Sequence, residues 1–258
     1  MSKKSSRAMD MRDLIQTAKE LAAKNIEKMI DAASEDALKD YLSRMNSGST
    51  GRATIISAED TAVELGAPKR ASVNAVLWTG QKNLARDNRF HLIGPDLPDS
   101  KGADRDYCQV VLLEIDEGQA PDPFKLESGQ FLPNRVPGVM ARMIPGRLWL
   151  RVSKAAVSSG INFSLIAAAV RKAYREIPGV KSVECIFADS DQETVQSFAG
   201  IASEARILAG RHKRISLGKN GDYECAELNC ESCEDKPVCD IIREVRVIRR
   251  RERAASRS

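Results

Sequence analysis

The chain has 258 residues, 42% hydrophobic and 29% charged, which is enough apolar material for a real core in one or two domains. No apolar run is long enough to cross a membrane, and the basic, amphipathic start lacks the apolar segment of a secretion signal. We therefore expect a cytoplasmic protein without a membrane partner.

The net charge of +4 is small but unevenly distributed, because seven arginines and only two glutamates occur from Arg243 to Ser258. A basic tail of this kind could bind nucleic acid or an acidic protein surface, but a solvated helix end explains it more simply. The composition also lacks the aromatic-rich basic groove that binds single strands, so we do not expect nucleic acid as a partner.

The N-terminal region is predicted to be helical. Between residues 10 and 45, apolar residues recur at spacings of three and four, in two successive stretches. The sequence NSGSTG at 46–51 then has the composition of a flexible connector. We therefore predict an N-terminal helical arm over residues 1–50.

A mixed α/β domain is predicted for residues 51–218. Strands are expected at ATIIS (53–57), SVNAVLWT (72–79), RFHLIG (89–94), YCQVVLLEID (107–116), GRLWLRVS (146–153) and VKSVECIFADS (180–190). Residues 117–138 are rich in proline and glycine and are predicted to form a long loop. The fold class that follows is α/β (α+β), a mixed sheet with flanking helices.

Two helices are predicted within this domain. One covers 162–178 and begins at an N-cap, Asn162 or Ser164, and the other covers 190–214, where Ser190 and Glu193 could form a capping box. The strand at 146–153, the first helix and the strand at 180–188 would form a βαβ unit or an α/β element of a mixed sheet.

A cysteine cluster dominates the last region, residues 219–258, which we predict to be a cysteine loop followed by a basic helix. Cys225, Cys230, Cys233 and Cys239 have the spacing C-x4-C-x2-C-x5-C and account for four of the six cysteines. Reduced thiols this close together indicate a metal centre, because disulfides do not persist in the cytoplasm. A [4Fe–4S] cluster is favoured over zinc, since there is one C-x2-C pair and no nearby histidine.

Several segments of the central region resemble the middle region of the β subunit of carbon monoxide dehydrogenase/acetyl-CoA synthase. They are ELGAP (64–68), RFHLIGPDLPD (89–99) and GRLWLRVSKAAVSSGINFSLIAAAVRKAYREIPGV (146–180), followed by a strand, a helix and clustered cysteines. The resemblance extends over about residues 55–240. It implies the family's fold, a role in anaerobic one-carbon and CO metabolism, and a protein partner in a multi-subunit complex.

The resemblance also implies site residues. Cys230, Cys233 and Cys239 match the start of the family's nickel–iron–sulfur ligand set, whereas Cys225 lies upstream of it, and the Cys-Gly-Cys motif that holds the distal nickel is missing. We therefore expect an iron–sulfur cluster without nickel in this chain. The family's coenzyme A contacts through arginines suggest Arg142, Arg147 and Arg151 as partners for coenzyme A; the alternative for each is a solvent-facing strand arginine.

Three functional hypotheses remain open. The first is an accessory or electron-transfer subunit with a [4Fe–4S] cluster, and the second is a partial acetyl-CoA synthase that a partner subunit completes. The third is a zinc-stapled binding module whose basic tail contacts nucleic acid or an acidic partner. The sequence contains no recognisable catalytic motif around His91, His212 or the Ser153–Lys154 pair, and Cys108 and Cys185 are expected in the core.

Overall fold

The computed structural model describes residues 10–25, 28–46, 55–100, 104–116, 118, 126, 136–144, 146–208, 215–217 and 223–225. The chain divides into two compact units, residues 1–208 and residues 209–258. The first unit contains α1 (Met11–Asn25), β1 (Lys28–Asp31), α2 (Glu35–Asn46), β2 (Thr61–Leu65), β3 (Ser72–Thr79), β4 (Arg89–Ile93), β5 (Asp104–Ile115), β6 (Val139–Ile144), β7 (Arg147–Ser153), α4 (Lys154–Ser158), α5 (Phe163–Arg175), β8 (Val180–Ser190) and α6 (Gln192–Leu208). The second contains the antiparallel hairpin of β9 (Ile215–Leu217) and β10 (Tyr223–Cys225).

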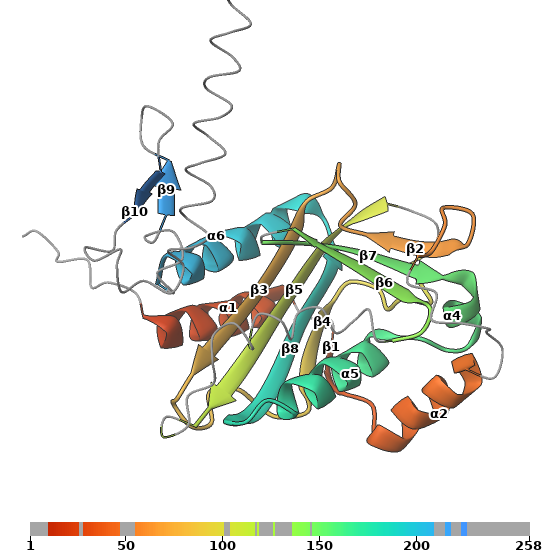
Figure 1. Cartoon of the computed structure of the whole chain (residues 1–258), viewed down its shortest axis with the longest axis horizontal. Helices are drawn as coiled ribbons and strands as arrows, with labels where there is room; N and C mark the ends of the chain where they lie inside the picture. The colour runs from red at the N-terminus through yellow and green to blue at the C-terminus, as the bar shows by residue number, and fades with distance from the viewer. Residues whose placement is uncertain are drawn as a thin grey trace, which may run out of the picture. The chain divides into compact units, whose positions relative to one another are not determined.

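An eight-stranded mixed sheet forms the centre of the first unit (Figure 1); seven strands follow the order β1-β4-β8-β5-β2-β7-β6, and the eighth, β3, pairs with β5. Strand β5 is its axis, because β8 pairs along one side in antiparallel fashion and two strands share the other side. On that other side, parallel β2 meets the first residues of β5 and parallel β3 meets the remainder. The predicted mixed α/β fold is confirmed.

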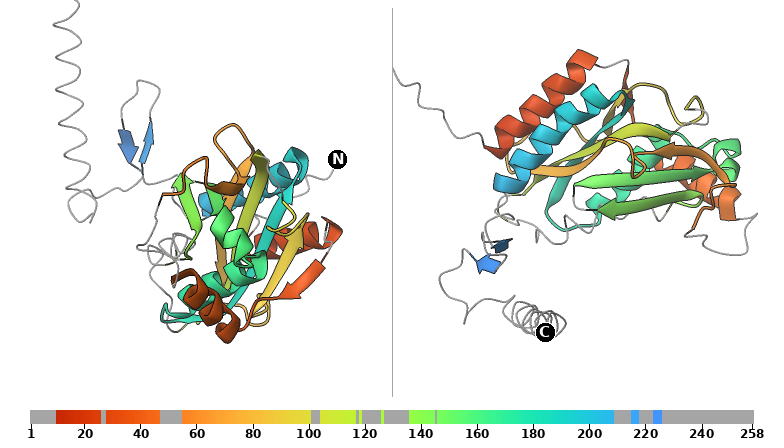
Figure 2. Two further views of the ribbon diagram at one scale, coloured as in Figure 1. Left: turned by 90° about the vertical axis from the view of Figure 1, so that its right-hand side faces the viewer. Right: turned by 90° about the horizontal axis from the view of Figure 1, so that it is seen from above.

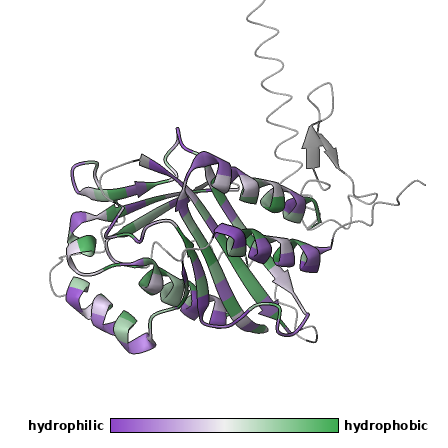
Figure 3. Cartoon of the chain, turned by 180° about the vertical axis from the view of Figure 1, so that it is seen from behind, coloured by the Kyte–Doolittle hydropathy of each residue, from purple (hydrophilic) through white to green (hydrophobic). Residues whose placement is uncertain are grey.

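The sheet is covered on both faces. Helices α1 and α6 lie side by side on one face (Figure 2), where Leu14, Phe198 and Val110 belong to one buried cluster. Helices α2, α4 and α5 contribute to a second cluster with the other face, which includes Phe163 and Phe187. Figure 3 shows mostly hydrophobic central strands and helices on which hydrophilic and hydrophobic residues are mixed. Burial on both sides explains why β5 reads as an apolar run and not as an alternating one.

The cap of α5 agrees with the sequence, whereas the cap of α6 does not. Asn162 caps α5 by accepting a hydrogen bond from the backbone N–H of Leu165 at 2.9 Å, as predicted. Helix α6 begins later than expected, because the Asp191 carboxylate accepts the backbone N–H of Thr194 at 2.8 Å. The predicted capping box at Ser190 is therefore wrong, and an Asx cap one residue further on takes its place.

Several predicted elements need correction. The predicted helical region contains β1, because residues 28–31 pair with the edge of β4 and this tertiary pairing outweighs the local helical pattern. Residues 55–57, within the predicted strand 53–57, lie outside the sheet, and the neighbouring strand is instead β2. Strand β6 follows the proline-rich region without having been predicted.

The predicted βαβ unit is also wrong, although its alternative, an α/β element of a mixed sheet, is confirmed. Strand β7 pairs with β2 and β6, while β8 pairs with β4 and β5, so the strands on either side of α5 are not neighbours. The two helices of the predicted N-terminal arm pack within the first unit, α1 against α6 and β3, and α2 against α5.

Candidate functional site

The three candidate coenzyme A arginines come from the β6–β7 pair. Arg147, Trp149 and Arg151 alternate along β7, so their side chains share one face of the sheet. Arg142 of β6 is the register partner of Trp149. We call Arg142, Arg147, Trp149 and Arg151 the arginine–tryptophan face.

The indole ring of Trp149 contacts two of these arginines. The guanidinium carbon of Arg151 lies 4.6 Å from the ring centroid and that of Arg142 lies 5.6 Å from it, which is within the range of cation–π attraction. The Glu64 carboxylate accepts hydrogen bonds from the Trp149 ring N–H and from Arg151 Nε, both at 2.8 Å. Glu64 therefore fixes the ring and neutralises the charge of Arg151.

Arg147 and Arg142 have surroundings that differ from those of Arg151. Arg147 donates to the carbonyl of Arg70 at 2.8 Å and approaches the carbonyls of Ala67 and Pro68 at 3.4 Å, so it braces the loop before β3, and no carboxylate in the described part of the chain pairs with it. Arg142 is exposed beside Trp149. Guanidinium groups on a strand face that also carries an indole can bind phosphate oxygens and flat ring systems. Among the described residues, Arg151 is thus the one of the three candidates that pairs with a carboxylate.

The cysteine cluster falls almost entirely outside the described residues. Cys225 is the last residue of β10 and is the register partner of Ile215, whereas Cys230, Cys233 and Cys239 lie beyond the described part of the chain. Within the described residues, no group of three or more histidine, cysteine or acidic side chains is placed to hold a metal. The proposed ligand set is therefore confined to the second unit.

The two remaining cysteines are core residues, as predicted. Cys108 and Cys185 are 0% and 1% exposed, and burial raises the pKa of both thiols far above its usual value. Since the thiolate is the form that binds metal, neither is suited to act as a ligand in the folded unit. The Ser153 hydroxyl likewise has a structural use, because it accepts the backbone N–H of Ala156 and caps α4.

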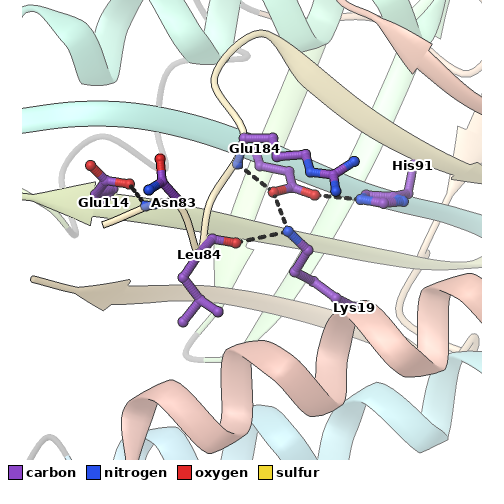
Figure 4. A network of polar contacts seen from close by, with 7 residues as sticks. Lys19, Asn83, Leu84, His91, Glu114 and Glu184 are labelled. Carbon is purple, nitrogen blue, oxygen red and sulfur yellow. Dashed lines mark hydrogen bonds and ion pairs between the residues drawn. The ribbon is translucent and has the colours of Figure 1, made fainter. Parts of the chain in front are cut away.

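A buried charged network, shown in Figure 4, was not predicted. Glu184 of β8 is completely buried and accepts hydrogen bonds from Lys19 Nζ of α1 at 2.9 Å and from the backbone N–H of Arg86 at 2.6 Å. His91 Nε2 of β4 lies 2.5 Å from its other oxygen, and Lys19 also donates to the carbonyl of Leu84 at 2.7 Å. Burial alone would raise the pKa of Glu184, but these donors hold it below the usual value.

This network connects α1 to the strands beneath it. The sequence signal was present, since Lys19 interrupts the apolar stripe of Ile15, Ala18 and Ala22, and Glu184 interrupts the apolar strand around Val183 and Cys185. Charged residues at buried positions require partners, and here they supply them to each other. His91 belongs to this network through its contact with Glu184, while His212 lies outside the described residues.

Comparison with sequence models of protein families shows which family the chain belongs to. A sequence model of the CO dehydrogenase/acetyl-CoA synthase complex beta subunit matches residues 44–194, more than half of the chain. The chain belongs to this beta subunit family. The predicted family is therefore confirmed, and a search of curated proteins found no match.

The family match covers only part of the chain. It runs from the end of α2 to the first turn of α6, and so it includes the arginine–tryptophan face and Glu184. Helix α1 and the four clustered cysteines lie outside the matched range. Among the described residues, none of the helices has the length and hydropathy needed to span a membrane.

Proposed function

We propose that this beta subunit-family chain is an iron–sulfur accessory or electron-transfer subunit of one-carbon, CO or acetyl-CoA metabolism. Its [4Fe–4S] cluster would be held by Cys225, Cys230, Cys233 and Cys239. The observation that carries the proposal is the C-x4-C-x2-C-x5-C spacing in a unit separate from the family domain. The buried cysteines of that domain leave these four as the thiols suited to bind metal.

The donor set fits such a cluster. Four thiolates are the usual ligands of a [4Fe–4S] centre, and the hairpin of β9 and β10 ends at the first of them. When bound, the cluster supplies one-electron transfer. The chain's own acidic residues near the ligands, Glu224, Glu227 and Glu231, would disfavour addition of an electron and keep the potential low.

The proposal includes a partner and a location. The family's name describes a complex, and we infer that the partner is another subunit of a complex of this kind in the cytoplasm. Four cysteine ligands leave a bare cluster no open position for methyl transfer. A partial acetyl-CoA synthase, completed by a partner, would instead require nickel-dependent acetyl exchange, which the missing Cys-Gly-Cys motif argues against.

A second binding function is favoured by the arginine–tryptophan face. Coenzyme A carries phosphates and a flat adenine, and Arg142 and Arg147 keep the charge needed for the phosphates. Arg151, paired with Glu64, would position Trp149 instead of contacting a phosphate. Isothermal titration with coenzyme A should show weaker binding in Arg142→Gln than in the control Arg89→Gln, and equal binding would argue against this face.

The main proposal is tested by metal analysis of protein purified without oxygen. About four irons and four sulfides per chain, with a reduced-cluster paramagnetic resonance signal, would support it. Cys230→Ser and Cys233→Ser should lose the signal, whereas Cys108→Ser serves as the matched control and should keep it. One zinc per chain without iron would contradict electron transfer and would indicate a structural zinc site. The alternative of a binding module with a basic tail would then be tested by measuring whether nucleic acid binding weakens with salt.

A further inference from the structure

We draw no further inference here: the strongest candidate, the pocket of about 480 Å³ that Arg70, Arg105, Asp106, Asp189 and Asp191 line at the carboxyl ends of β4 and β8, indicates no ligand, because Arg105 is matched by the buried Asp189, Arg70 has an interaction partner of its own, and nothing else in the described part of the chain connects the acidic pair Asp106 and Asp191 with a ligand.

Discussion

Replacing Glu184 with glutamine tests whether the buried carboxylate holds α1 on the sheet. The change keeps the size of the side chain and one acceptor oxygen, but it removes the negative charge that faces Lys19 and His91. Lys19 Nζ would then have the Leu84 carbonyl at 2.7 Å and a neutral amide oxygen, but no carboxylate, as acceptors among the described residues, with the lysine side chain only 18% exposed. An ammonium group in that position loses its counter-ion without regaining full hydration.

The expected loss of stability follows from burial. A hydrogen bond to a charged group contributes about 1.5–3 kcal/mol, and breaking a buried ion pair costs about 3–5 kcal/mol. Glu184 is fully buried but Lys19 reaches some solvent, so we expect Glu184→Gln to lower the unfolding free energy by about 3 kcal/mol. The double variant Lys19→Met/Glu184→Gln removes both the lysine charge and the carboxylate charge. Its loss of unfolding free energy should therefore be about 2 kcal/mol smaller than the sum of the losses in the two single variants.

Urea unfolding followed by circular dichroism at pH 7 measures both quantities in a double-mutant cycle. Lys181→Met is the matched control, since it breaks an ion pair with Asp116 in which both side chains are about half exposed, and we expect no resolvable change from it. A Glu184→Gln variant as stable as the control, or a fully additive cycle, would refute the idea that this network docks α1.

Three further outcomes are expected. The folded-state pKa of Glu184 is lowered, so the unfolded chain takes up this proton first as the pH falls, and stability decreases as the pH drops below the usual value of 4.5 towards the folded pKa. In urea unfolding at a series of acid pH values, the stability of Glu184→Gln should decrease less steeply. An unchanged slope would contradict this. Gly94→Ala should destabilise the first unit by about 2 kcal/mol or more through its positive φ and the overlap with Asp189, whereas Gly200→Ala, where the added Cβ meets open space, should be tolerated; equal melting temperatures would count against it. After metal removal under reducing conditions, iodoacetamide should modify the clustered cysteines well before Cys108 and Cys185, as read by mass spectrometry, and equal rates would show that these two thiols are not protected by burial.

The sequence predicted the elements whose own residues carry a strong pattern. Strands β3 and β8 were placed at their observed bounds, because β3 is mostly apolar and because Val183, Cys185 and Phe187 of β8 alternate on one face. Helix α5 was found from its apolar period and from Asn162, which caps it as expected. In these segments local preference and tertiary burial agree, so local reasoning is sufficient.

The failures have a common cause in long-range pairing. Strand β1 carries little apolar signal and is stabilised by the edge of β4, including an ion pair between Arg89 and Asp31 at 3.0 Å. Strand β2 is short and is defined by partners almost 90 residues later in β7. The Glu184 network draws on residues 165 positions apart, which no local window contains. For the same reason the pocket beside Arg105 was not predicted.

The structure also changes how the three candidate arginines should be interpreted. They share one pair of strands, yet their partners give them different uses. Arg151 is bound to Glu64 and orders Trp149, and Arg142 remains exposed beside the ring. Arg147 instead holds the carbonyl of Arg70, whose side chain lines the pocket at the ends of β4 and β8. Loss of Arg147 would therefore disturb the loop before β3 as well as the arginine–tryptophan face, whereas loss of Arg142 would affect the face alone.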